Sequence, residues 1–571
     1  MFDYSTNHSD RVNGMQLLQE HMAPSALYDS SERFDPPKCD EDTRTGLLEE
    51  LWGWVENPST VDRMVCITGP AGSGKSALQQ TTVEEAAEHN HLLAAFFFSS
   101  GDARRNHPGG FVATLAYQVS QNIGETREPM IQAIERDPRI FERSRETQAR
   151  TLIVLPIRKA LALSNASPSS WPSNIFIDGV DECRNEEDQS HLLRILQSLA
   201  ISERGHLKQS GLLYHIELSN YDATSDIRLY LRRKLHDIGC NSEYARTPTG
   251  PWPPSKDIDT LVDNASGQFI YASTIVKFLS DRRRNPFKHL QLVLTWAPGT
   301  NRREQPFASL DALYASIFLA AQEAYAKSRD TEDDLVIVRS IRMFQLLAKH
   351  SIKPHVSSME EILSLDGGEI QIIMSDLHSI VKSWGNQAGR LSLTFHHKSI
   401  EDFLQDPKRS RKLFISDVEV ALIWLEICVR VVKSADDSVI QGLSARSNDW
   451  DNCHWTLFSP LNIYMTSLET VLFEGTDVQI NQAGLLLKSA TFWTHFTTSC
   501  KFVSARDMNW GMLMSRNMKS LVNKARSLGL SGSDPNWTGI LTSIEKWRDM
   551  VNKLHEDEWR PSSEHFRLMG K

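Results

Sequence analysis

The residues of this chain best suited to chemistry form a glycine-rich segment that ends in a lysine and a serine. The segment satisfies the pattern G-x-x-x-x-G-K-[ST], in which the glycines let the backbone turn so that successive N–H groups converge on phosphates. Lys75 would reach the β and γ phosphates of a nucleoside triphosphate, and the Ser76 hydroxyl would complete the shell of a magnesium ion. The predicted nucleotide-binding residues are Gly69, Pro70, Ala71, Gly72, Ser73, Gly74, Lys75 and Ser76.

A second group of polar residues follows the apolar run Ile175–Ile177. On a strand next to the one that precedes the glycines, Asp178 would hold magnesium through water. Asp181 or Glu182 would then polarise an attacking water molecule as the catalytic carboxylate. The alternative is a strand that simply runs into an acidic turn. The glycine-rich segment about 100 residues upstream favours the metal site.

These residues need a scaffold of alternating strands and helices to bring them together. Apolar runs at Met64–Thr68, Leu92–Ser99 and Ile175–Ile177 predict buried parallel strands. Helical spacing covers the segments between them: 77–88, 110–122 and 147–162. This alternation predicts an α/β domain with a parallel sheet and helices on both faces. After Asp257 the pattern is almost entirely helical, apart from a short hairpin expected at Arg390–His396.

Composition limits the classes of protein to which the chain can belong. With 571 residues, 40% hydrophobic and 23% charged, it has the profile of a folded, multi-domain protein. The net charge of -10 provides no general attraction for nucleic acid. Seven widely spaced cysteines without a CxxC pair indicate a reducing compartment. Neither a secretory signal nor an apolar run long enough to cross a bilayer is visible, so we expect a cytoplasmic protein with no transmembrane segment.

Several motifs, in order, resemble one family of nucleotide-binding proteins. They are RFDPPKC, GPAGSGKS, FFFSSGDARRN, FIDGVDEC, WPPSKDIDTLVDNASGQFIYASTIVKFL and LDALYASI. Over about residues 20–320 the chain is similar to the NACHT-type P-loop NTPases of filamentous fungi, which carry a nephrocystin-like N-terminal domain and belong to the STAND class of signalling ATPases. A weaker similarity extends to about residue 415, through FHHKSIEDFLQDP.

The resemblance implies a domain order and a mode of action. We expect an extended arm at 1–40, a NACHT P-loop NTPase domain at 41–240 and a helical domain at 241–330. A winged-helix-like domain at 331–416 and a helical region of unknown role at 417–571 would follow. In such proteins nucleotide exchange opens a closed, ADP-bound form for self-association or partner binding. His397 would touch the ADP β-phosphate, Gly267–Tyr271 would lie behind the nucleotide, and Thr43 with Arg44 would lie near the base.

One departure from the family pattern bears on hydrolysis. Relatives carry a further buried strand after the Asp178 region, and an arginine at its end senses the γ-phosphate. Here Leu212–Leu218 resembles the strand that comes after it, and Arg204 is the only nearby arginine. We therefore expect weakened nucleotide binding and very slow or absent hydrolysis. The alternative function is a degenerate scaffold that keeps the fold without cycling.

Overall fold

The computed structural model divides the chain into two compact units. The first comprises residues 1–313 with the short segment His397–Ser399, and the second comprises 314–396 and 400–571. The structure describes residues 13–33, 36–57, 64–102, 104–163, 171–183, 185–202, 213–244, 252–296, 307–329, 333–350, 352, 354–385, 389–434, 463–464, 466–488, 522–530, 537–538, 541–542, 544–545 and 549. The predicted boundaries at 240, 330 and 416 do not coincide with this division and stay predictions.

The first unit alternates strands and helices up to β4. Its strands are β1 (Met64–Thr68), β2 (Leu92–Phe97), β3 (Asn174–Asp178) and β4 (Leu213–Glu217). The helices among them are α1 (Gly14–His21), α2 (Thr45–Glu56), α3 (Lys75–Glu88), α4 (Phe111–Asn122), α5 (Arg127–Arg136), α6 (Arg145–Ala149), α7 (Leu155–Leu163) and α8 (Glu186–Ser202), with a π-helical turn at Arg150–Val154 that joins α6 to α7. Four further helices complete the unit: α9 (Thr224–Cys240), α10 (Ser255–Ala265), α11 (Phe269–Leu279) and α12 (Pro286–Thr295).

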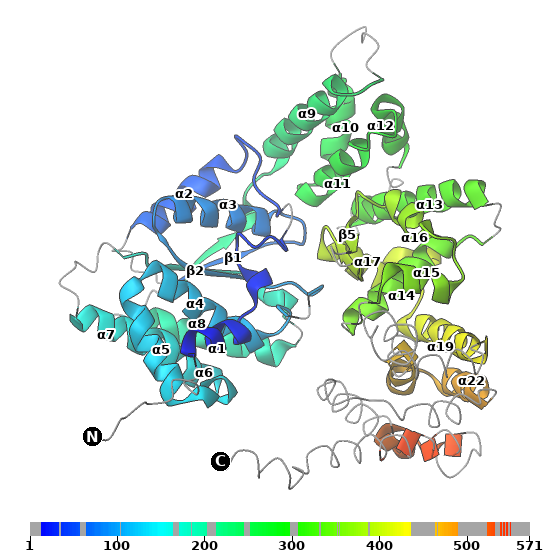
Figure 1. The fold of residues 1–571 in the computed structure, drawn as a ribbon. Helices are drawn as coiled ribbons and strands as arrows, with labels where there is room; N and C mark the ends of the chain where they lie inside the picture. Colours follow the sequence, from blue (N-terminus) through cyan, green and yellow to red (C-terminus); the bar gives the residue numbers. More distant parts are fainter. Residues whose placement is uncertain are drawn as a thin grey trace, which may run out of the picture. The chain divides into compact units, whose positions relative to one another are not determined.

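Helices cover the strands of this unit from two sides. Figure 1 shows α2 and α3 on one side of β1 and β2, and α1, α4 and α5 on the other. The packing agrees, because Val83 of α3 lies in one apolar cluster with Ala95 and Phe97, whereas Phe96 and Phe98 pack with α4 in a separate cluster. Alternate residues of β2 therefore face different helices, as a strand's side-chain period of two requires. An α/β unit with parallel strands is present, as predicted.

The strands pair in two separate ladders. β1 pairs in parallel with β4, and β2 pairs in parallel with β3. The expectation that Asp178 lies on a strand next to the one preceding the glycines is therefore wrong, because β3 has β2 and not β1 as its partner. In the described part of the chain no strand joins the two ladders. All five residues of β1 are only partly buried, although the apolar sequence predicted a buried strand.

The outer edge of β2 is closed by a side chain instead of a strand. Gln118 of α4 accepts a hydrogen bond from the Ala95 N–H at 2.9 Å and donates one to the Ala95 carbonyl at 2.8 Å. An amide side chain has the donor and acceptor that a neighbouring peptide group would supply. This explains how β2 is buried along its whole length with a single strand partner.

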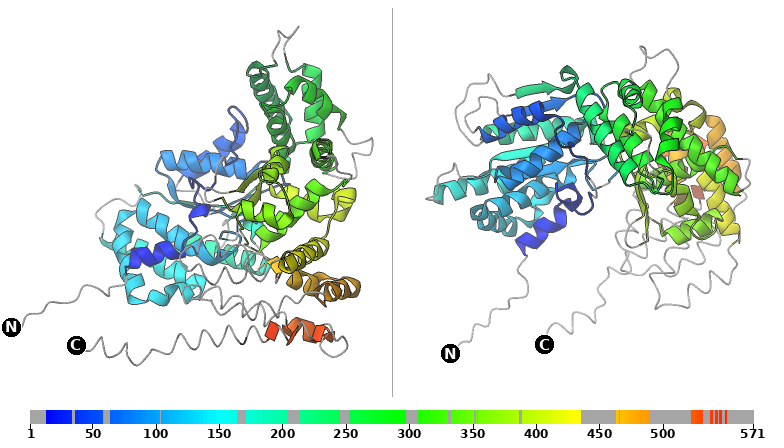
Figure 2. Two further views of the ribbon diagram at one scale, coloured as in Figure 1. Left: turned by 45° about the vertical axis from the view of Figure 1, so that its right-hand side comes forward. Right: turned by 90° about the horizontal axis from the view of Figure 1, so that it is seen from above.

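The N-terminal residues differ from the prediction. The prediction of an extended arm over residues 1–40 is wrong for residues 14–26, because α1 and a short 3-10 turn (Pro24–Ala26) form there. Asn13 caps α1 by accepting hydrogen bonds from the Met15 and Gln16 N–H groups. Leu18 is fully buried, and α1 packs against α4 and α5, as the two views of Figure 2 also show. The helix forms because it completes the core of the first unit.

The second unit is mostly helical. After α13 (Ala308–Arg329) come α14 (Val336–Lys349), α15 (Val356–Leu363) and α16 (Glu369–Ser375), then the antiparallel strands β5 (Val381–Gly385) and β6 (Leu391–Phe395). The helices α17 (Lys398–Gln405), α18 (Pro407–Ser410), α19 (Asp417–Ser434) and α22 (Asp477–Lys488) follow. The hairpin predicted at Arg390–His396 contains only the second strand, since the first lies upstream. A winged-helix assignment for this region stays a prediction.

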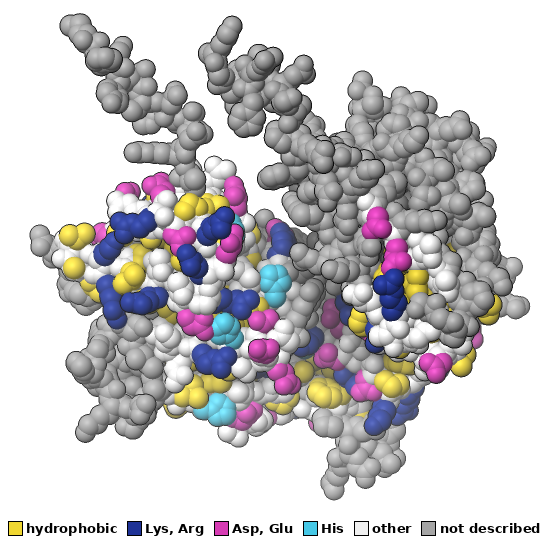
Figure 3. All heavy atoms as spheres, turned by 90° about the horizontal axis from the view of Figure 1, so that it is seen from below, with side chains coloured by type: hydrophobic (Ala, Val, Ile, Leu, Met, Phe, Trp, Pro, Cys, Tyr) yellow, Lys and Arg dark blue, Asp and Glu magenta, His cyan; other side chains and the backbone are white. Residues whose placement is uncertain are grey.

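Two observations concern membrane-spanning helices and the distribution of surface charge. Among the described residues, none of the helices has the length and apolar character needed to span a membrane. On the face shown in Figure 3, Lys and Arg side chains are interspersed with Asp and Glu side chains.

Candidate nucleotide-binding site

The glycine-rich loop, residues 69–76, connects β1 to α3 in the first unit. Gly72 has a φ of +80°, a backbone conformation that residues with a side chain rarely adopt. A Cβ at this position would lie 2.2 Å from Ile270 Cγ2. Gly74 precedes α3 with a φ of +99°, in the left-handed region. No side chain caps α3 at this position. The backbone N–H groups of its first turn are therefore available to an anion, which the helix dipole also favours.

Two polar side chains of the loop are suited to a phosphate ligand. The Ser73 hydroxyl is buried and has no hydrogen-bond partner among the described residues. The Lys75 ammonium donates to the carbonyls of Gly69 at 2.7 Å and Pro70 at 3.1 Å, within its own loop. An ammonium held only by neutral carbonyls can exchange them for charged phosphate oxygens with a net gain. The loop therefore has the composition and the conformation to receive the phosphates of a nucleotide.

The predicted metal ligands come together. Asp178 ends β3, and its carboxylate lies near the Ser76 hydroxyl at the start of α3. Burial raises the pKa of Asp178, while the nearby Ser76 hydroxyl and then the Arg33 charge act in the opposite direction. A hydroxyl and a carboxylate are oxygen ligands of the kind magnesium takes, with water and phosphate supplying the rest. Ser76 and Asp178 would hold such an ion. The described residues contain no cluster of three or more metal-ligating side chains.

The two predicted catalytic carboxylates lie in a 3-10 turn, Val180–Glu182, directly after Gly179. Asp181 is exposed, whereas burial raises the pKa of Glu182. Glu182 accepts hydrogen bonds from the Ser100 backbone N–H at 2.9 Å and from its hydroxyl at 3.3 Å. The Glu182 carboxylate is thus fixed in position beside the end of β2, and Asp181 is open to solvent.

Helices that follow the strands also contact the loop. The Ile270 N–H of α11 donates to the Gly72 carbonyl at 3.2 Å, so the start of α11 contacts the loop. The expectation that Gly267–Tyr271 lies behind the nucleotide stays a prediction. Arg44 donates to the Ser73 carbonyl at 3.1 Å, and its guanidinium lies over the Phe269 ring. Arg44 therefore joins the loop to α11. A contact of Thr43 or Arg44 with the base stays a prediction.

Three arginines outside the predicted site lie near the end of β2. In the FFFSSGDARRN motif, Arg104 and Arg105 follow the strand and have the pattern of a solvated loop pair. Arg104 is indeed half-exposed and bonds to Glu32 and Asp102, but Arg105 is largely buried and donates to the Phe97 carbonyl at 3.1 Å. Arg33 has no local signal beyond its place in the RFDPPKC motif; it is 8% exposed and stacks on the Phe97 ring. Folding of the chain, and not a local sequence pattern, places Arg105 and Arg33 at the end of β2.

His397 follows β6 and precedes α17. Its Nδ1 accepts a hydrogen bond from the Ser399 N–H at 3.1 Å, so the neutral ring carries its proton on Nε2. A donor to a phosphate would therefore be Nε2. The role of His397 in nucleotide binding stays a prediction, and Arg204 lies outside the described residues.

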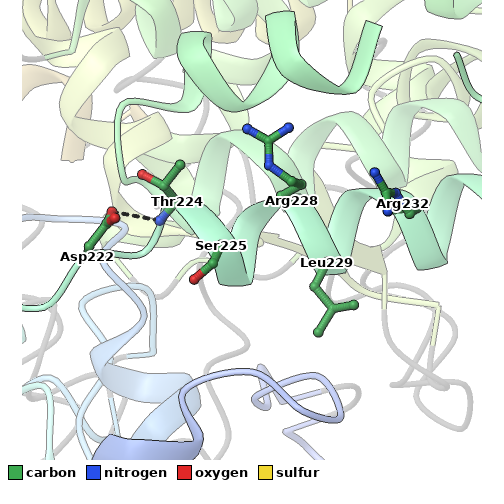
Figure 4. A pocket seen from close by; sticks show the side chains of 6 residues that line it. All are labelled: Asp222, Thr224, Ser225, Arg228, Leu229 and Arg232. Atoms are coloured by element: carbon green, nitrogen blue, oxygen red, sulfur yellow. Dashed lines mark hydrogen bonds between the residues drawn. The ribbon is translucent and has the colours of Figure 1, made fainter. Parts of the chain in front are cut away.

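A surface pocket of about 350 Å³ lies along α9, and none of its lining residues is a predicted site residue. Figure 4 shows its lining side chains, including Asp222, which accepts a hydrogen bond from the N–H of Thr224, the first residue of α9, at 2.9 Å. The lining residues are Asp222, Thr224, Ser225, Leu229, Arg228 and Arg232. Because Arg228 is already paired with Asp259 of α10, we assign no ligand to this pocket.

The first unit thus contains an α/β domain in which a glycine-rich loop faces a carboxylate at the end of a parallel strand. Residues 43–209 match the family described as Nephrocystin 3, N-terminal, so this segment is a nephrocystin-3-type N-terminal domain. The match confirms the resemblance to that domain of NACHT-type proteins over these residues. Neither a curated protein nor a solved structure matches the chain.

Proposed function

We propose that the protein is a nucleotide-dependent signalling switch of the NACHT and STAND class, which binds ATP or GTP with magnesium. The observation that carries the proposal is the closeness of Asp178 to Ser76, next to the Lys75 ammonium and the uncapped N-terminus of α3. Two segments far apart in the sequence, the start of α3 and the end of β3, contribute to this one place, and together they offer the groups that a nucleoside triphosphate with magnesium needs.

Each site residue has a distinct task in this proposal. The N–H groups of the loop and of the first turn of α3 bind the β-phosphate, and Lys75 bridges the β and γ phosphates. Ser76 and Asp178 hold magnesium, which when bound neutralises the charge on the phosphates. Glu182, fixed by Ser100, orients a water molecule towards the γ-phosphate, and Asp181 assists from the solvent side.

Nucleotide binding would be transmitted through the contacts of the loop. The Ile270–Gly72 hydrogen bond and the Arg44 bridge support this, because a shift of the loop on binding phosphate must move α11 as well. A nucleotide biases an open–closed equilibrium only by the difference in its affinity for the two states. His397 would favour the closed, diphosphate-bound state by donating to the β-phosphate. The open state would self-associate or bind a protein partner.

Hydrolysis is expected to be very slow or absent. Between β3 and β4 the described residues contain α8 and no strand, and the two ladders are not joined. A γ-phosphate-sensing arginine on a strand between β1 and β3 is therefore lacking from the described part of the chain. Slow turnover suits a timer better than a metabolic enzyme. None of the described cysteines forms a disulfide, which supports a reducing, cytoplasmic location.

The experiment that tests the switch compares assembly with nucleotide state. Full-length protein would be loaded with magnesium and either ADP or a non-hydrolysable ATP analogue, and its mass distribution measured by mass photometry. The proposal predicts a monomer with ADP and larger species with the triphosphate. Binding of both nucleotides with one unchanged mass distribution and no captured partner would contradict the switch.

The unjoined ladders favour one alternative, a scaffold that keeps the fold without cycling. β1 pairs only with β4 in the described structure, and its apolar residues are partly exposed. A scaffold would keep its structure and its assembly state whether or not nucleotide is present. A Lys75→Ala protein with wild-type assembly behaviour would support it.

A further inference from the structure

Arg33 is a buried cation in the first unit. Its guanidinium carbon lies 3.7 Å from the centre of the Phe97 ring, and its Nη1 donates to the Tyr28 carbonyl at 3.1 Å. Its relative exposure of 8% is unusual for arginine, which is almost never fully buried unless it is paired. Stacking on a ring leaves the N–H donors free in the guanidinium plane, so the group can still bind an anion along its edge.

The place of Arg33 is defined by the register of β2 and β3. Phe97, under the guanidinium, is the residue of β2 that pairs with Asp178. Neighbouring strands lie about 5 Å apart, so Arg33 stands at the strand edge where Ser76 meets Asp178. The Arg33 charge lowers the pKa of Asp178 more than the Lys75 charge does, which agrees with a short separation.

The Arg33 guanidinium forms no ion pair with a described residue, although the carboxylates of Asp178, Glu84 and Asp29 attract it, in that order. Glu84 is bound to Lys38 at 2.8 Å. A second guanidinium, that of Arg105, lies close by; it donates to the Phe97 carbonyl and is paired with Asp102 at 3.4 Å. Burial and then the charge of Arg105 lower the pKa of Arg33 to about 10. An additional anion at this edge would meet a buried guanidinium that no ion pair among the described residues engages.

We propose that Arg33 is a specificity-determining residue of the nucleotide site, whose guanidinium binds the terminal phosphate of a nucleoside triphosphate and so distinguishes it from the diphosphate. This inference rests on the proposed function. The terminal phosphate lies beside the metal ion that Ser76 and Asp178 would hold, which is the edge that Arg33 faces. Arg33 precedes the segment 43–209 that matches the nephrocystin-3 family, so this assignment does not come from that match.

The chemistry favours arginine in this role. A guanidinium offers several donors in a fixed plane, which suits the oxygens of a phosphate better than a point charge does. The diphosphate has no group at this place and gains nothing from Arg33. The residue therefore contributes to the difference in affinity between the two nucleotides, which is the quantity that drives a switch.

The test measures two dissociation constants on full-length protein, for ATPγS and for ADP, each with magnesium. We expect Arg33→Gln to weaken ATPγS binding about 10- to 100-fold, as for the loss of a charge-assisted hydrogen bond, and to change ADP binding less than about twofold. Arg33→Lys, which keeps the charge, should recover part of the loss. Arg44→Gln is the matched control, because Arg44 is a second buried arginine over a phenylalanine ring. It should weaken both nucleotides by the same factor.

The outcomes separate this inference from the proposed function. If Arg33→Gln is folded by circular dichroism and changes both affinities equally, or neither, the inference is wrong while nucleotide binding stands. If the wild-type protein binds neither nucleotide, the proposed function and the inference both fail. Should Arg33→Gln not fold, Arg33→Lys decides, since an unchanged ratio of the two affinities in that variant would also overturn the assignment.

Discussion

Replacing Lys75 by alanine perturbs the proposed site with little effect on the fold. In the structure the Lys75 ammonium makes two hydrogen bonds, both to carbonyls of its own loop. Removing them frees Gly69 and Pro70 to bond with water, so we expect the free energy of unfolding to change by less than about 1 kcal/mol. With nucleotide bound, the same ammonium would face phosphate oxygens, and such charge-assisted bonds contribute about 1.5–3 kcal/mol each.

The affinity of Lys75→Ala for nucleotide should therefore fall by about 2–4 kcal/mol, which is about 30- to 1,000-fold in the dissociation constant. Isothermal titration calorimetry with ATP and with GTP, each with magnesium, measures this and identifies the preferred base. Lys159→Ala is the control, because Lys159 is an exposed lysine on α7 of the same unit. Equal affinity of the wild-type and Lys75→Ala proteins would refute the role of the loop.

Four further predictions follow from the same geometry. Gly72→Ala places a methyl group against Ile270 and should lower the melting temperature, while Gly46→Ala, in open space on α2, should raise it slightly, as thermal unfolding will show. Turnover measured with magnesium ATP should be very slow, and a rate normal for the class that Glu182→Gln abolishes would contradict this. His397→Ala should weaken the closed state by about 1–2 kcal/mol, visible as faster ADP release, whereas unchanged release and oligomer size would show that the assignment is wrong. Because burial raises the pKa of Glu182 in the folded state, this group's contribution to stability is lost as the pH rises above the unfolded-state pKa of about 4.3 and through the raised folded-state pKa. Chemical denaturation at a series of pH values should therefore show the stability of Glu182→Gln increasing relative to the wild type as the pH rises, and a constant difference would argue against this.

Sequence patterns predicted the parts of the site that are local. The strand Met64–Thr68 has the bounds expected of it, and the strands β2 and β3 lie within two residues of their predicted limits. Each is a short apolar run beside a turn signal, which is the pattern that periodicity detects most readily. The closeness of Ser76 and Asp178 was also predicted, but from a neighbouring position of their two strands that the structure does not show, since β3 pairs with β2 and not with β1.

What the sequence did not predict depends on contacts between distant segments. No local sequence pattern predicts that Arg33 lies near Asp178. The two are brought together because Arg33 stacks on Phe97, the residue of β2 that pairs with Asp178. Gln118 closes the edge of β2 from another helix, which no strand pattern encodes. The helix α1 lies before a proline-containing stretch that suggested an extended arm, and it forms because its apolar face completes a core built by α4 and α5.

The most direct test of the central proposal is the nucleotide content of the purified full-length protein. The protein would be denatured, and the released small molecules identified and quantified by mass spectrometry. We predict a bound adenosine or guanosine nucleotide, with ADP or GDP that exchanges slowly as the mark of a closed switch, and much less from Lys75→Ala. A folded wild-type protein that releases no nucleotide, and that takes up none when ATP or GTP is added with magnesium, would contradict nucleotide binding.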